Sequence, residues 1–231
     1  MQRTGAPDTG RGMIVYQMPH SPFCIPVTRI LSALGVEFQT RDLPNWDRSE
    51  IIELTGGEYY QVPVLVDGER VVYESSADSQ DLALYLDTLY AGGRLFPGSI
   101  EGPHRCVIDF LENEVEARGF KLGDIHYVPA ITDLVGRTMT IRHKERRFGR
   151  GCVDQWRAQA KELRAELDGL LARFEDTLRL RPFLFGEEPV YGDFLLFGVL
   201  GNFCWNNANT LHETQRGLRE FVARMRDYRF S

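Results

Sequence analysis

Cysteine is scarce in this sequence, and no cysteine lies close to another. The four are Cys24, Cys106, Cys152 and Cys204. Zinc sites are usually built from closely spaced pairs of cysteine or histidine, so this spacing excludes the common zinc patterns and argues against a disulfide framework. We therefore expect reduced thiols, no bound metal and a cytoplasmic location, since disulfides persist mainly in oxidising compartments.

Long apolar runs and an excess of basic charge are lacking as well. No segment reaches the roughly 18 consecutive apolar residues of a membrane-spanning helix. Residues 1–12 are polar and rich in glycine, without the apolar stretch of a signal peptide, and we interpret them as a flexible tail. Lys and Arg number 27 against 33 Asp and Glu, which gives a net charge of −6. These features predict neither a membrane nor a nucleic-acid partner.

The first part of the chain shows strand-like and helix-like patterns in turn. A β-branched and aromatic run at 13–17 predicts a strand. Apolar residues then recur at every third or fourth position, which predicts a helix that begins near Phe23 or Cys24 and ends at Gly35. Residues 36–43 alternate between apolar and polar and predict a second strand. The chain thus opens with a β-α-β unit.

A second helix and a hairpin follow. We expect a helical or irregular piece around residues 48–54. The Asp-Gly pair at 67–68, between apolar runs at 64–66 and 71–73, is a strong short-range signal of a β-hairpin. From Ser75 onward, leucines spaced by three or four predict a third helix with serine N-caps at its start. The predicted order, β-α-β-α-β-β-α, is typical of a thioredoxin-like α/β domain.

The second part of the chain shows only helical patterns. Apolar residues step by three or four along 156–178, which predicts an amphipathic helix. Residues 191–205 are apolar nearly all round, as in a helix at the centre of a bundle. We expect a first domain over 13–89, a Gly- and Pro-containing linker over 90–100, and an all-helical domain over 101–231.

Three short motifs lie between the predicted elements of the first domain. They are "SPFC" at 21–24, "QVPVL" at 61–65 and "ESS" at 74–76. With the predicted topology they resemble the amino-terminal domain of a bacterial-type cytosolic glutathione S-transferase. The resemblance spans most of the chain and implies a thioredoxin-like α/β domain followed by an all-α helical bundle. It also implies a cytoplasmic homodimer with glutathione as co-substrate.

The first motif offers two candidates for sulfur chemistry. A free thiol with a pKa of about 8.5 is mostly protonated at neutral pH, and a hydroxyl donor at the first turn of a helix can stabilise the reactive thiolate. Conjugating relatives often carry serine at the first motif position, so the resemblance assigns Ser21 as the donor and Cys24 as a packing residue. The alternative makes Cys24 the catalytic thiol, which requires that solvent can reach it.

The other two motifs are expected to hold glutathione. Hydroxyl and N–H donors at a helix start suit the α-carboxylate of its γ-glutamyl end, and the family's Glu-Ser pair maps onto Glu74 and Ser75. The family's proline is cis and exposes the backbone of the preceding residue. The resemblance therefore implies that Pro63 is cis and that Val62 pairs with the cysteinyl amide of glutathione, with Gln61 beside it.

The electrophilic substrate is expected between the two domains. The candidate lining residues are all aromatic: Phe23, Phe120, Tyr127 and Trp156. Phe23 is also a candidate glutathione contact because it lies in the first motif. The run 142–150 carries five Lys or Arg and is interpreted as a solvated basic helix end. If it has a function, it favours an anionic substrate or a partner subunit.

The start of the predicted central helix departs from the family pattern. Members of the family usually begin this helix with Ser or Thr followed three residues later by Asp, a capping box. Here Asp193 is present, but Val190 stands where the hydroxyl belongs. Half of the reciprocal cap is therefore missing, which predicts a less stable helix start.

Taken with the resemblance, these motifs predict a detoxifying glutathione transferase. Bound glutathione would be held as a thiolate that attacks an electrophilic small molecule, with no metal involved. Two other classes stay open. One is a thiol–disulfide oxidoreductase or reductive deglutathionylase that uses Cys24. The other is a non-catalytic binding protein that keeps the fold without the chemistry.

Overall fold

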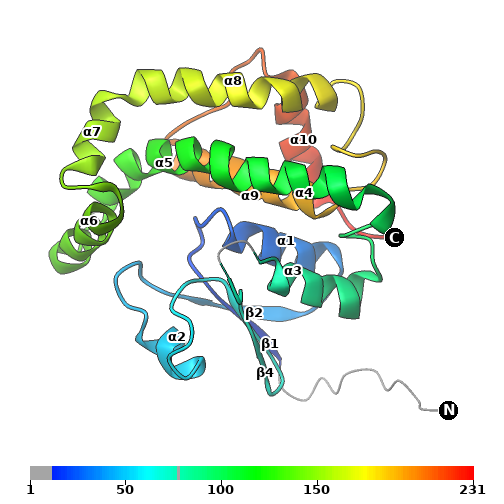
Figure 1. Cartoon of the computed structure of the whole chain (residues 1–231), viewed down its shortest axis with the longest axis horizontal. Helices are drawn as coiled ribbons and strands as arrows, with labels where there is room; N and C mark the ends of the chain where they lie inside the picture. The colour runs from blue at the N-terminus through cyan, green and yellow to red at the C-terminus, as the bar shows by residue number, and fades with distance from the viewer. Residues whose placement is uncertain (1–11, 77–78) are drawn as a thin grey trace.

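The computed structural model describes residues 12–76 and 79–231 of the 231-residue chain. A small sheet with three helices forms the first part, and a bundle of helices forms the second (Figure 1). The predicted tail at 1–12 lies, apart from Gly12, outside the described residues. Among the helices of the described ranges, none has both the length and the apolar character that crossing a membrane requires.

Four strands make one mixed sheet in the order β2-β1-β3-β4. Their bounds are Met13–Gln17 for β1, Phe38–Asp42 for β2, Val64–Asp67 for β3 and Arg70–Val72 for β4. β1 runs parallel to β2 and antiparallel to β3, and β3 pairs antiparallel with β4. The Asp-Gly hairpin is confirmed: Gly68 turns with φ +61°, a left-handed conformation that suits glycine.

Three helices accompany the sheet. They are α1 (Cys24–Ala33), α2 (Ser49–Leu54) and α3 (Asp81–Leu86), and α3 runs on into the π-helical turn η1 (Asp87–Ala91). Figure 1 shows α1 and α3 between the sheet and the helical part. The predicted start of α1 at Phe23 or Cys24 is confirmed, and so is its end at Gly35, which has φ +69°. The predicted start of α3 at Ser75 is wrong, because this helix begins at Asp81.

The second part is helical throughout its described elements, as predicted. Its elements are η2 (Gly98–Ile100), α4 (Glu101–Phe110), η3 (Leu111–Val115), α5 (Glu116–Ala130), α6 (Leu134–Phe148), α7 (Cys152–Ala158), α8 (Ala160–Leu178), α9 (Tyr191–Phe203), η4 (Trp205–Asn207) and α10 (Arg216–Asp227). The helix predicted over 156–178 is interrupted at Gln159, whose φ of −98° and ψ of 13° separate α7 from α8.

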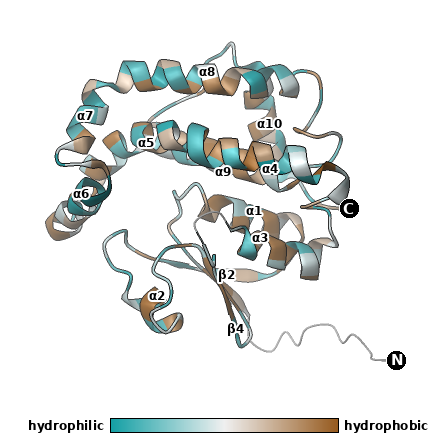
Figure 2. Cartoon of the chain, in the orientation of Figure 1, coloured by the Kyte–Doolittle hydropathy of each residue, from teal (hydrophilic) through white to brown (hydrophobic). Residues whose placement is uncertain are grey.

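The central helix α9 is buried on nearly every side, as its all-round apolar pattern predicted. It packs against α1, α5 and α10, so that one continuous apolar core runs from the sheet through the bundle. In contrast to α9, the helix α8 has a hydrophilic outer face, as the hydropathy colours of Figure 2 show. Close packing of α9 on α1 brings the second part of the chain directly against the loop that carries the first motif.

Candidate active site

Ser21 lies at the start of α1, and the local backbone holds it there. Its N–H donates to the carbonyl of Met18 at 2.9 Å, and its own carbonyl accepts from the N–H groups of Cys24 and Ile25 at 3.2 and 3.1 Å. Its Oγ accepts from the N–H groups of Phe23 and Cys24 at 3.3 and 3.4 Å. The serine therefore caps the first turn of α1, with its hydroxyl at the positive end of the helix.

Cys24 is fully buried, with 0% of its surface exposed. It belongs to a small apolar cluster whose other buried members are Leu43, Ile51, Val62 and Val64. Burial raises the pKa of its thiol to about 11, which outweighs the opposite effect of a hydrogen bond with Ser21. Cys24 therefore lacks the solvent access and the lowered thiol pKa that favour disulfide exchange, and its side chain packs within this cluster.

The second part of the chain packs closely against the loop before α1 and bonds to it. The side-chain amide of Asn202 on α9 donates to the carbonyl of His20 at 2.6 Å, and the rings of His20 and Tyr127 lie 4.0 Å apart. A Cβ added to Gly198 would come within 2.3 Å of the carbonyl oxygen of Pro22. Only glycine allows α9 to approach this closely. Asn202 and Gly198 were not predicted as site residues, and the one signal in the sequence was a glycine inside an apolar helix.

Positive charges gather beside this loop. The pKa of His20 is lowered to about 4, first by burial and then by the charges of Lys144 and Arg48. The guanidinium of Arg48 donates to the carbonyl of Pro44 at 3.0 Å and to the side-chain oxygen of Asn45 at 3.2 Å, both neutral acceptors. His20 is therefore neutral at physiological pH, and the charge near the loop comes from Lys144 and Arg48.

The second motif forms the turn into β3. The peptide bond between Val62 and Pro63 is cis, as the resemblance implied. Both residues are buried, whereas the side chain of Gln61 is exposed. No hydrogen bond to the backbone of Val62 occurs among the residues that the structure describes. The backbone groups of this turn are thus free to pair with an extended peptide.

In the third motif the glutamate caps α3, whereas the sequence predicted that its serines would do so. The carboxylate of Glu74 accepts from the hydroxyl of Ser79 and the N–H of Asp81, both at 2.7 Å, and more weakly from the N–H of Leu82 at 3.4 Å. Glu74 therefore caps α3 from seven residues upstream. The hydroxyl at the start of this helix belongs to Ser79, which was not among the predicted residues. Ser75 is exposed and donates its N–H to Asp81.

The four aromatic candidates for the substrate pocket divide into two groups. Phe23, next to Ser21, has 36% of its surface exposed, and the Tyr127 ring packs at a tilt against the His20 ring beside the same loop. Trp156 instead is 6% exposed, and its ring meets those of Phe120 and Phe148 at 5.5 and 5.3 Å. The assignment of Trp156 to the pocket is corrected: it is a core residue, because α7 buries it against α5.

The basic run at 142–150 is not uniformly solvated. Arg142 is exposed and pairs with Glu145 at 2.5 Å, as expected for a surface helix. Lys144 turns inward, forms an ion pair with the buried Asp124, and lies 5.3 Å from the centre of the Phe120 ring. One member of the run thus belongs to the interior between α5 and α6.

Across the described ranges 12–76 and 79–231, no group of three or more His, Cys, Asp or Glu side chains is placed to hold an ion. The site offers the Ser21 hydroxyl at the start of α1, the backbone groups of the turn at Val62 and the half-buried carboxylate of Glu74. These groups suit the binding of a peptide with a thiol.

Comparison with known proteins supports the fold described above. Residues 15–94 match the model of the glutathione S-transferase N-terminal domain. No curated protein sequence matches the chain. Among solved structures, the glutathione transferase GSTFuA3 from Phanerochaete chrysosporium is 17% identical, with a TM-score of 0.76 over 96% of this chain and 98% of that one.

Two further structures share the fold. The glutathione S-transferase CsGST63524 of Ceriporiopsis subvermispora, in complex with glutathione, is 15% identical with a TM-score of 0.76 over 96% of this chain and 99% of that chain. BphK, a bacterial transferase solved as a ternary complex, is 19% identical with a TM-score of 0.62, over 93% of each chain. Residues 15–94 therefore belong to the glutathione S-transferase N-terminal domain family, and the fold of the whole chain is that of the cytosolic glutathione S-transferases.

Proposed function

We propose that this protein is a glutathione transferase that binds glutathione, stabilises its thiolate and directs it at an electrophilic carbon of a small molecule. The observation that carries the proposal is the Ser21 hydroxyl at the start of α1. Its oxygen accepts two backbone N–H groups. A serine hydroxyl has one donor and two acceptor positions, so these contacts leave its hydrogen available for donation.

A neighbouring sulfur competes for that hydrogen. In the free protein the Ser21 hydroxyl hydrogen-bonds with the thiol of Cys24, which stays neutral because its pKa is about 11. A thiolate is the stronger acceptor, since hydrogen bonds to charged groups are stronger than those between neutral groups. The Ser21 hydroxyl therefore donates to the glutathione sulfur instead of to Cys24, and the proton of the glutathione thiol passes to solvent. The thiolate then forms a carbon–sulfur bond as the leaving group departs.

The remaining contacts to glutathione are part of the same proposal. The backbone of Val62 pairs with the cysteinyl amide, with Gln61 at the exposed side of the turn. The carboxylate of Glu74 attracts the ammonium of the γ-glutamyl end, and the exposed hydroxyl of Ser75 donates to its carboxylate. Because Glu74 is already bonded to the start of α3, it also orients the segment that carries Ser75.

The electrophile is proposed to lie against Phe23 and Tyr127. Phe23 is exposed directly beside Ser21, and Tyr127 reaches the same loop from α5 through its contact with His20. Aromatic rings at this position favour an apolar or aromatic electrophile, since such surfaces gain most from leaving water. The reaction is of the kind that detoxifies reactive organic compounds.

We also propose that the protein is a cytoplasmic homodimer. Leu84 and Leu89 leave apolar side chains 44% and 49% exposed on α3 and η1. A second copy that covers them would remove this surface from water. Light scattering during size-exclusion chromatography should give the mass of two chains, and Leu84→Asp should shift the equilibrium toward one. A single-chain mass for the unmodified protein would refute the dimer.

The mechanism is tested by ultraviolet difference absorbance during titration with glutathione at neutral pH. We expect a bound-thiolate signal in the unmodified protein that disappears in Ser21→Ala. The control is Ser32→Ala, which removes a hydroxyl from the same helix that donates to the Thr28 carbonyl at 2.8 Å, well inside α1. It should keep the signal.

Other outcomes separate the alternatives. Glutathione binding without any thiolate signal in the unmodified protein would refute stabilisation by Ser21 and leave a binding protein. A complete lack of binding would leave the family fold and remove the transferase activity.

A further inference from the structure

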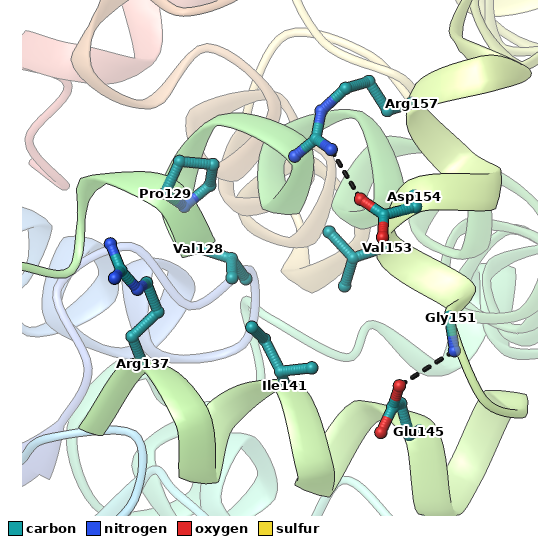
Figure 3. A pocket seen from close by; sticks show the side chains of 9 residues that line it. All are labelled: Val128, Pro129, Arg137, Ile141, Glu145, Gly151, Val153, Asp154 and Arg157. Atoms are coloured by element: carbon teal, nitrogen blue, oxygen red, sulfur yellow. Dashed lines mark hydrogen bonds and ion pairs between the residues drawn. The ribbon is translucent and has the colours of Figure 1, made fainter. Parts of the chain in front are cut away.

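A cavity of about 230 Å³ lies between the end of α5, one face of α6 and the start of α7 (Figure 3). Nine residues line it: Val128, Pro129, Arg137, Ile141, Glu145, Gly151, Val153, Asp154 and Arg157. None of the nine belongs to the proposed glutathione site or to the candidate electrophile contacts. This cavity is therefore separate from the chemistry described above.

The walls of the cavity are mostly apolar. Val128 and Val153 are 3% and 7% exposed, and Pro129 and Ile141 complete the apolar lining. In Figure 3, Ile141 rises from α6 toward the end of α5, and Val153 faces it from α7. Such walls gain free energy when they exchange water for an apolar group.

Two of the charged side chains in the lining are already neutralised by each other. Asp154 pairs with Arg157 at 2.6 Å across one turn of α7, as Figure 3 shows. A third, Glu145, accepts from the N–H of Gly151 at 2.9 Å and from Arg142 at 2.5 Å. These three charges therefore have partners within the protein and leave little attraction for a ligand.

Arg137 is the exception. Its guanidinium makes no hydrogen bond or ion pair with any residue in the described part of the chain, although the side chain is half-buried at the cavity wall. Arg137, Ile141 and Glu145 are spaced by four residues, so they stand on one face of α6. An arginine fork without a partner, beside apolar walls, suits a carboxylate that it can hold through two parallel bonds.

We propose that this cavity binds a small monocarboxylate with an apolar body, whose carboxylate pairs with Arg137 and whose hydrocarbon contacts Val128, Ile141 and Val153. The volume of about 230 Å³ is below the roughly 300–1,000 Å³ of sites for drug-sized ligands. The occupant is therefore a single-ring or short-chain acid. The site is independent of glutathione binding, because it shares no residue with that site.

Isothermal titration calorimetry with octanoate and with octan-1-ol tests the proposal. The two probes share the same chain and differ only in the charged group. We expect octanoate to bind at least about 10-fold more weakly to Arg137→Gln than to the unmodified protein, because a charge-assisted pair is lost. Octan-1-ol should bind both proteins alike, since only the apolar walls recognise it.

The matched control is Arg146→Gln, which removes the same charge from an exposed position of α6 outside the cavity. It should leave octanoate binding within about 2-fold of the unmodified protein, as expected for an exposed charge. A second variant, Ile141→Trp, fills the cavity and should abolish binding of both probes, with circular dichroism to verify its fold.

Three results would overturn the proposal. They are no octanoate binding at millimolar concentration, equal loss in Arg137→Gln and Arg146→Gln, and unchanged octanoate binding in a folded Ile141→Trp protein. The first excludes the ligand class, the second reduces the effect to general charge attraction, and the third moves the binding elsewhere. Titration with glutathione in the same variants is expected to be unchanged, which keeps this test separate from the proposed transferase function.

Discussion

His104 provides a sharp test of how the central helix is held in place. It lies on α4, is 2% exposed, and its Nε2 accepts the backbone N–H of Gly192 in the first turn of α9 at 2.9 Å. The first N–H groups of a helix have no partner inside the helix. Burial lowers the pKa of His104 to about 4, because the charged ring would be cut off from water. The neutral ring is the form that can accept this bond.

The lowered pKa makes stability depend on pH. The unfolded state binds a proton at the ordinary histidine pKa of 6.5, whereas the folded state does so only at about 4. The contribution of His104 is therefore complete above pH 6.5 and is lost as the pH falls through this window, because the proton taken up by the unfolded chain favours unfolding. By linkage, the loss reaches about 2 kcal/mol at pH 5.

Substitution separates the hydrogen bond from the titration. In His104→Gln the amide oxygen can still accept the N–H of Gly192, but the side chain cannot take up a proton. In His104→Ala the N–H is left without a partner in the core, which costs about 1–3 kcal/mol in addition to the cavity that remains. At pH 7 we therefore expect the free energy of unfolding to fall in the order unmodified protein, His104→Gln, His104→Ala.

Urea unfolding followed by circular dichroism at pH 7 and pH 5 measures both effects. The difference between the unmodified protein and His104→Gln should shrink by about 2 kcal/mol at the lower pH. His20, whose pKa is also lowered to about 4, is present in both proteins, so its contribution cancels. A difference that does not change between pH 7 and pH 5 would show that His104 is not held neutral by the fold, and would refute the reasoning.

Three further predictions address the loop before α1 and the start of α9. Cys24→Ala should keep the thiolate signal and conjugating activity, because the buried thiol has a pKa of about 11. Loss of turnover while glutathione binding is retained would favour the disulfide-exchange alternative. Gly198→Ala should weaken glutathione binding in calorimetry, since the new Cβ falls within 2.3 Å of the Pro22 carbonyl oxygen. Unchanged affinity would refute the inference that close packing of α9 holds the loop in place. The N–H of Asp193 already donates to the Val190 carbonyl at 2.9 Å. Val190→Thr should add a second acceptor, a side-chain hydroxyl, and raise the free energy of urea unfolding by at most about 1 kcal/mol; no gain would mean that the cap needs no hydroxyl.

Asp193 shows why the departure from the capping pattern is tolerated. Its carboxylate accepts from the N–H of Val190 at 3.0 Å and from the N–H of Leu184 at 2.8 Å. The acid thus ties the preceding loop to the helix start, while His104 satisfies another N–H of the first turn. A missing hydroxyl at Val190 is compensated in part by groups that the capping motif does not include.

Local patterns in the sequence determined most of the first domain. Strand and helix periods, the Asp-Gly turn and the break at Gly35 each depend on a few adjacent residues, so the order of elements was predictable from them. The cis bond before Pro63 followed from the resemblance, and the resemblance itself depended on three short motifs in the right order. The all-helical second part was predictable because no strand pattern interrupts its apolar spacing.

Only the tertiary structure decided which side chains meet. Serines after Glu74 looked like helix caps, yet α3 begins later because the Glu74 carboxylate reaches it across a loop. Trp156 looked available for a substrate, yet α7 turns it into the core. The hydrogen bond from Asn202 to the carbonyl of His20 joins segments 182 residues apart in the sequence. Periodicity predicts which face of an element is apolar. The burial, the pKa and the hydrogen-bond or ion-pair partners of a side chain depend on how whole elements pack against one another.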